Sequence, residues 1–170
     1  MSDEIINKVA NSGLISIDLE EFYPKGERVL FDIKPLLFHE LILKEKDFRE
    51  FIKQHDWTVY QNKFVAITCT NDAVIPTWAY MLLSIALQPY AKKIVFGTLD
   101  TLEAILFNDV LQQLNYESYK NQRIVINGCS NLPVTMHAYT TLVAALTPIA
   151  KSIMFGEPCS TVPLYKAKVS

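Results

Sequence analysis

Short apolar runs and longer apolar segments alternate along the last two-thirds of the chain. Residues 65–67 and 94–96 are apolar without polar alternation, which is typical of strands that are covered on both faces. An apolar segment long enough for a helix lies between them, and the same succession recurs at residues 123–156. From residue 64 the pattern predicts the order β-α-β-α-β-α-β. Helical crossovers imply parallel strands and right-handed connections.

A further helix is predicted between the two groups of strands. Asp100 and Glu103 resemble a capping box with a carboxylate in place of the usual hydroxyl, which predicts that the helix begins there. Apolar residues then recur at three- and four-residue spacing, as on one face of a helix. This face consists of Leu102, Ile105, Leu106, Val110 and Leu114.

The two groups of strands are similar in sequence. Residues 78–97 and 137–156, which lie 59 positions apart, are identical at 11 of 20 positions. Upstream, residues 69–71 match residues 129–131 at an offset of 60, which predicts that one residue was lost or gained between strand and helix. We interpret residues 64–97 and 123–156 as two copies of one β-α-β unit.

The first 63 residues give a less regular pattern. The stretch at residues 36–43 fits either a helix or a strand. The other elements are predicted as helices near residues 3–11 and 45–56, strands near 14–19 and 28–33, and a turn at 23–26. The length of 170 residues fits one domain. We therefore predict a single three-layer α/β domain over residues 1–170, with a mostly parallel sheet and with elements of residues 1–63 packed on a duplicated core at 64–170.

Composition excludes several classes of protein. The net charge of -2 argues against a nucleic-acid binder and against binding to anionic membranes. The longest apolar run, residues 78–87, is half of the ~20 residues that a membrane span needs. An acidic start without a signal peptide and three widely spaced cysteines indicate a cytoplasmic protein with free thiols.

Charged residues are distributed unevenly. Residues 1–63 carry 12 acidic and 9 basic side chains, whereas residues 64–170 carry only 6 and 7. So few charges predict that another surface covers part of the second region. We expect a homo-oligomer, most simply a dimer, and a protein partner is a further expectation.

Three segments carry a resemblance to a known family. Residues 156–166, together with residues 23–27 and 127–129, resemble the bacterial family known as domain of unknown function 2480, over nearly the whole chain. The family has no assigned activity, so the resemblance implies no particular chemistry. The genes of the family tend to neighbour iron–sulfur assembly genes, which would fit a thiol-bearing accessory protein.

Candidate site residues gather where predicted strands end and helices begin. Ligands bind at this edge of open parallel sheets, and helix N-termini there hold anions and lower the pKa of thiols. Cys129 and Asn131, with Cys69 and Asn71 in the other copy, occupy such positions. The alternative is that the cysteines pack as small apolar residues and the asparagines cap helices. Gly128 favours Cys129 as the site residue, since a glycine lets backbone or ligand approach closely.

The polar stretch after the last predicted strand adds further candidates. Cys159, Ser160 and Thr161 would emerge at the same edge as Cys129 if the sheet is parallel. His137 could act as a general base beside Cys129, although such a histidine is more often a packing or interface residue. A soft-metal site from Cys129, Cys159 and His137 lacks the short ligand spacing of metal motifs, so we predict no metal.

Two functional hypotheses follow. The chain has no P-loop, G-x-G-x-x-G, G-x-S-x-G or H-E-x-x-H motif, so no cofactor is predicted. The first hypothesis is a non-catalytic cytoplasmic accessory or interaction protein linked to iron–sulfur or thiol handling. The alternative is a small cysteine-dependent enzyme or anion-binding protein that uses Cys129 with His137 or Asn131 at the C-terminal edge of the strands. Thiol reactivity at neutral pH would separate the two hypotheses.

Overall fold

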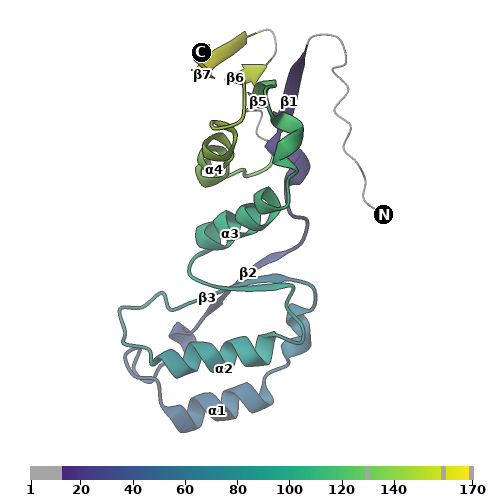
Figure 1. Cartoon of the computed structure of the whole chain (residues 1–170). Helices are drawn as coiled ribbons and strands as arrows, with labels where there is room; N and C mark the ends of the chain where they lie inside the picture. Colours follow the sequence, from purple (N-terminus) through teal and green to yellow (C-terminus); the bar gives the residue numbers. More distant parts are fainter. Residues whose placement is uncertain (1–12, 129–130, 158–159, 169–170) are drawn as a thin grey trace. The chain divides into compact units, whose positions relative to one another are not determined.

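The computed structural model describes residues 13–128, 131–157 and 160–168, and the chain divides into two compact units. Unit 1 comprises residues 1–24 and 106–170, and unit 2 comprises residues 25–105. Each unit has its own sheet (Figure 1). The predicted α/β class with mostly parallel strands is confirmed, but the strands form two sheets and not one. The assignment of residues 1–170 to a single domain stays a prediction.

Unit 2 is a parallel three-stranded sheet in the order β2-β3-β4. Two helices connect its strands and lie on the same side of the sheet (Figure 1). Consecutive parallel strands joined by right-handed crossovers place their helices in this way. The elements are β2 (Arg28–Asp32), α1 (Glu45–Gln54), β3 (Phe64–Thr68), α2 (Thr77–Leu87) and β4 (Lys93–Phe96).

The central strand β3 is buried on both faces, as its uninterrupted apolar run predicts. Val65 and Ile67 belong to a core that includes Phe48 of α1 and Leu83 of α2. On the opposite face, Arg28 of β2 forms an ion pair with Glu103 of α3 (Leu99–Gln112). Helices therefore contact both faces of this sheet, in agreement with the predicted three-layer arrangement.

Unit 1 has a four-stranded sheet in the order β1-β5-β6-β7. The first three strands are parallel, and β7 pairs antiparallel with β6. Ile124 and Ile153 of the sheet pack with Leu142 of α4 and Leu111 of α3 in one core. The elements are β1 (Leu14–Asp18), β5 (Arg123–Asn127), α4 (Met136–Leu146), β6 (Ser152–Glu157) and β7 (Ser160–Lys166).

The two β-α-β units have matching bounds. Phe64 pairs with Lys93 in one sheet, and Arg123 pairs with Ser152 in the other, so all four positions match at an offset of 59. The loops at 69–76 and 128–135 have equal lengths. The predicted loss or gain of one residue between strand and helix is therefore wrong. The duplication itself stays a prediction, which the equal spacing supports.

Several local predictions need correction. Helix α3 begins at Leu99, and Thr98, not Asp100, caps it: Thr98 Oγ1 accepts a hydrogen bond from Thr101 N at 3.3 Å. Residues 36–43 form neither a regular helix nor a strand, because a short 3₁₀ helix (Lys34–Leu36) precedes an isolated bridge between Phe38 and Ile42. The helix expected near residues 3–11 lies outside the described residues.

Three further 3₁₀ helices complete the described elements: η1 (Leu19–Phe22), η3 (Trp57–Tyr60) and η4 (Tyr116–Tyr119). None of the helices among the described residues has the length and apolar character needed to cross a membrane.

Candidate functional site

The predicted site at the end of β5 differs from expectation. Helix α4 begins only at Met136, where Thr135 caps it by accepting a hydrogen bond from Ala138 N. Asn131 lies in an exposed loop five residues before this helix, so the expectation that it lies where a helix begins is wrong. Cys129 lies outside the described residues.

The loop amides that could hold an anion are bonded within the chain. Glu20 Oε1 accepts hydrogen bonds from Asn131 N at 2.5 Å and Leu132 N at 3.2 Å. A carboxylate that accepts backbone N–H bonds is the contact an external anion would make at the same place. The N–H groups of Asn131 and Leu132 are therefore already satisfied by Glu20 and are not open to an external anion.

The other predicted site residues of unit 1 have structural contacts. His137 is exposed, and its Nε2 lies 3.1 Å from Asn108 Oδ1 of α3. Ser160 and Thr161 are not in a turn: they begin strand β7, where they pair with Glu157 and Gly156. Cys159 lies outside the described residues. Besides Asn108, His137 has Thr141 of its own helix as a neighbour, with Nε2 3.4 Å from Thr141 Oγ1.

In unit 2, the end of β3 forms a small polar cluster. Asp32 accepts hydrogen bonds from Thr70 Oγ1 at 2.5 Å, Thr70 N at 3.0 Å and Lys34 N at 2.9 Å. Cys69 Sγ lies 3.6 Å from the carbonyl oxygen of Asn71. The Asn71 side chain donates to the carbonyl of Glu40. These bonds tie three loops together, so Asn71 acts as a loop tether here and not as a helix cap.

The pKa values of two ionisable groups in this cluster differ from their ordinary values. Burial alone would raise the pKa of Asp32, but the hydrogen bonds from Thr70 and Lys34 outweigh it and lower this pKa below 3.8. Burial raises the pKa of Tyr80, and the nearby Cys69 and Asp32 raise it further. A carboxylate with its acceptors filled stabilises the loops and is poorly placed to take a proton. Among the described residues, no group of three or more acidic, His or Cys side chains is arranged to hold a metal.

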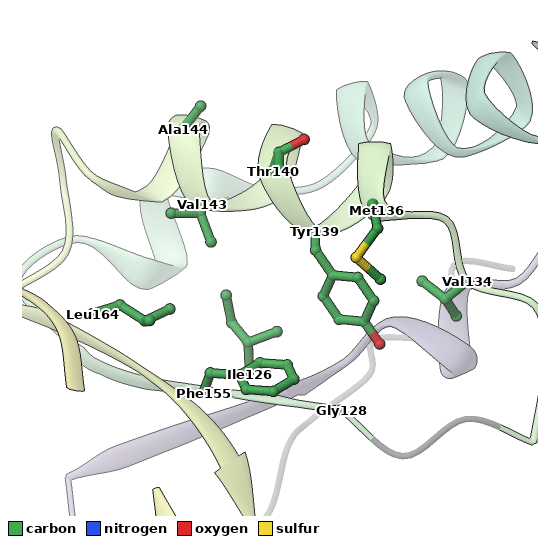
Figure 2. Close-up of a pocket in the computed structure, with 10 residues that line it drawn as sticks. All are labelled: Ile126, Gly128, Val134, Met136, Tyr139, Thr140, Val143, Ala144, Phe155 and Leu164. Carbon is green, nitrogen blue, oxygen red and sulfur yellow. The ribbon is translucent and has the colours of Figure 1, made fainter. Parts of the chain in front are cut away.

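An apolar groove with a volume of about 590 Å³ lies beside α4 in unit 1 (Figure 2). We call it the α4 groove. The volume lies within the range of about 300–1,000 Å³ usual for binding pockets. All ten lining residues are uncharged: Ile126, Gly128, Val134, Met136, Tyr139, Thr140, Val143, Ala144, Phe155 and Leu164.

Helix α4 supplies one wall of the groove. In Figure 2 the side chains of Met136, Tyr139 and Val143 point from the helix toward Phe155 of β6. The Tyr139 and Phe155 rings meet edge to face, with centroids 5.9 Å apart. The spacing of 136, 139, 140, 143 and 144 is that of one helix face, the kind of face that packs against another helix.

The opposite wall depends on β7. Leu164 of this strand lines the groove across from α4 (Figure 2). Only residues 158–159 separate β6 from β7, so no helix lies between these strands. By contrast, α1, α2 and α4 each connect two adjacent parallel strands. The α4 groove therefore lies where the regular alternation of strands and helices would place one more helix.

Sequence reasoning missed this groove. The helical spacing of Met136, Tyr139 and Val143 could have indicated an apolar helix face. Such a face usually packs against the core of the protein, so the spacing alone does not predict an open groove. The groove also needs strand β7, which supplies Leu164. The sequence did not predict this strand, because residues 157–163 are typical of a turn.

Comparison with known proteins supports the sequence resemblance. A search of curated proteins and a search of solved structures each found no match to the chain. The model of the family "Protein of unknown function (DUF2480)" matches residues 3–167. Because this match spans nearly the whole chain, the protein belongs to this family of unknown function.

Proposed function

We propose that the protein is a non-catalytic interaction protein that binds an amphipathic helix of a partner in the α4 groove. The observation that carries the proposal is the apolar groove at the strand pair β6–β7, beside the exposed face of α4. Peptide helices bind in this way, with apolar residues at i, i+3, i+4 and i+7 inserted into a hydrophobic groove.

The chemistry of the groove supports a helix with large apolar side chains. Every lining residue is uncharged, and Met136 is 72% exposed. A methionine in such a wall adapts to different partners because its side chain is flexible and polarisable. Thr140 and Ala144 are small, so the backbone of a second helix could approach α4 at the usual distance of about 8–10 Å.

A selection experiment tests this function. Helical peptides from a randomised library would be selected on the full chain, and their affinities measured for the wild type, Met136→Glu and Thr77→Glu. Both substitutions place a glutamate at the first residue of a helix, where negative charge is tolerated. Only Met136→Glu puts the charge in the groove, so Thr77→Glu is the matched control.

We expect selected peptides to share apolar residues at helical spacing and to bind Met136→Glu at least about tenfold more weakly, because an unpaired charge is costly in an apolar site. Binding that is unchanged by Met136→Glu would contradict the proposal. A free fatty acid that fills the groove while no helix binds would show a small-molecule site instead.

A homo-oligomer belongs to the same proposal, and unit 2 supports it. Phe96, Met81 and Ile85 are each at least 60% exposed. Gly97 N donates to Ile67 O, so in this parallel ladder the N–H groups of Ile94 and Phe96 face away from β3. Among the described residues no strand pairs with that edge of β4, whereas β7 pairs with the corresponding edge of β6.

A second copy fits this edge of β4. A twofold axis at Val95 would set Ile94 opposite the partner's Phe96, and each such pair would exchange two backbone hydrogen bonds. The two α2 helices would then lie two strand spacings apart, roughly 10 Å. Helices pack at this distance, so Met81 and Ile85 would become buried.

The alternative function, a cysteine-dependent enzyme or anion-binding protein at the loop after β5, has less support. Glu20 already bonds the amides of Asn131 and Leu132, and α4 begins five residues after Asn131. Alkylation by iodoacetamide tests it, because Cys129 should react faster than Cys69 near neutral pH if its thiol is activated. The proposal also includes a cytoplasmic location, which rests on the sequence. A link to iron–sulfur or thiol handling is included as well and rests on the family resemblance.

A further inference from the structure

A row of basic side chains crosses the sheet of unit 1 at the start of β5 and β6. Arg123 pairs with Ser152, and Ser152 pairs with Lys166, so the three residues are neighbours on adjacent strands. Directly paired residues point to the same face of a sheet, with Cβ atoms about 4.5–5.5 Å apart. Arg123 and Lys166 therefore flank the hydroxyl group of Ser152.

These side chains line a second cavity of about 360 Å³. Its wall also includes Lys151, so three cations surround one hydroxyl. Met154 and Pro163, which pair with each other two residues further along β6, supply an apolar floor beside the basic row. Tyr165 completes the lining.

The three cations lack counter-charges within the part of the chain that the structure describes. Arg123, Lys151 and Lys166 are exposed, and none forms an ion pair with another described residue. Like charges this close repel each other, so a bound anion would stabilise them. This local excess of positive charge contrasts with the net charge of -2 for the whole chain.

In unit 2 an arginine of the corresponding row, on the strand next to the position that matches Arg123, binds a carboxylate. The corresponding row there is Arg28, Phe64 and Lys93. Arg28 Nε and Nη2 bind the two carboxylate oxygens of Glu103 at 2.5 and 3.2 Å. A planar two-oxygen anion thus binds Arg28 of this row, and this is the geometry in which arginine binds carboxylate and phosphate.

We propose that the cavity lined by Arg123, Lys151, Ser152 and Lys166 is a binding site for a small organic anion, a carboxylate or phosphate monoester with an apolar body. The anionic oxygens would accept hydrogen bonds from Arg123, the lysines and the Ser152 hydroxyl. The apolar body would lie on Met154 and Pro163. The site is separate from the α4 groove, with no lining residue in common.

Titration of the isotope-labelled full chain with phenyl phosphate tests the proposal, with inorganic phosphate and phenol as the two halves of the probe. We expect the amide signals of residues 123, 152 and 166 to shift at millimolar phenyl phosphate, with weaker effects from either half. Arg123→Gln should reduce the affinity by about tenfold, since it removes the charge-assisted hydrogen bonds of the guanidinium.

Lys120→Gln is the control, because Lys120 is an exposed cation of the same unit outside the cavity. Its affinity should match the wild type within twofold. Equal losses in both variants, or shifts spread over all surface lysines, would show only general charge attraction and would overturn the proposal. No shift at any concentration would overturn it too. Arg123→Lys, which keeps the charge but not the fork of donors, should fall between wild type and Arg123→Gln.

Discussion

The ring of Phe155 fills the space that a side chain at residue 128 would need: a Cβ built on Gly128 would stand 2.2 Å from Phe155 Cζ. The sequence suggested that this glycine leaves room for a ligand or for Cys129. In the structure it leaves room for an aromatic wall of the α4 groove.

Gly128→Ala should therefore displace Phe155. We expect the free energy of unfolding to fall by about 1–3 kcal/mol, the usual cost of an overpacked site. Urea unfolding measures this. Phe155→Leu should relieve the clash, so the double variant should be more stable than the sum of the two single changes predicts. Strictly additive effects would show that the two positions do not interact.

The ion pair between Arg28 and Glu103 should stabilise unit 2. Both side chains are only 13% exposed. Glu103→Ala should lower the free energy of unfolding by about 2 kcal/mol, because it leaves a shielded guanidinium without this carboxylate. Glu117→Ala removes the exposed pair with Lys120 and should cost less than about 0.5 kcal/mol. Similar losses in the two variants would contradict this account.

Asp32 should make stability depend on acid pH. Its pKa is lower in the folded chain than the ordinary 3.8, so the stabilisation is complete well above 3.8 and is lost as pH falls through the folded value. Thr70→Val removes the hydroxyl that donates to Asp32 Oδ2. We expect this variant to be less stable than wild type at pH 7 and to approach it once Asp32 is protonated. A deficit of constant size from pH 7 to pH 2 would mean that the lost contact does not involve the carboxylate charge.

The edge of β4 that no described strand covers predicts the form of the dimer. Phe96→Lys places a charge on an exposed strand edge, which is how natural sheets prevent edge pairing. We expect light scattering to give twice 19.4 kDa for the wild type and 19.4 kDa for this variant. Val59→Lys, at another exposed apolar position of unit 2, should stay dimeric. A dimeric Phe96→Lys would exclude this interface but not the dimer, and a monomeric wild type would exclude both.

Local pattern was sufficient to predict most elements of the fold. The apolar runs at residues 64–67 and 124–126 lie within β3 and β5, because buried parallel strands need no polar alternation. The division into two sheets was not predictable in the same way. Strand β1 pairs with β5, more than 100 residues later, and periodicity reports how a strand is buried but not which strand is its partner.

The sites show the same limit. Strand β7 contains Pro163 and begins with Ser160 and Thr161, residues that favour turns, and its pairing includes a register shift near Met154. Both proposed binding surfaces depend on this strand, because Leu164 lines the α4 groove and Lys166 completes the basic row. The predicted edge residues Asn71 and Asn131 instead lie in loops whose polar groups are bonded within the chain, as the Asn71 side chain is to the carbonyl of Glu40.

The position of a bound helix tests the central claim most directly. A selected helical peptide would be titrated into the full chain with labelled methyl groups. We predict that the methyl signals of Met136, Val143 and Leu164 shift together and saturate with the peptide, while those of Met81 and Ile85 in unit 2 stay unchanged. Shifts confined to Met81 and Ile85, or saturable binding that leaves Val143 and Leu164 unaffected, would contradict the account.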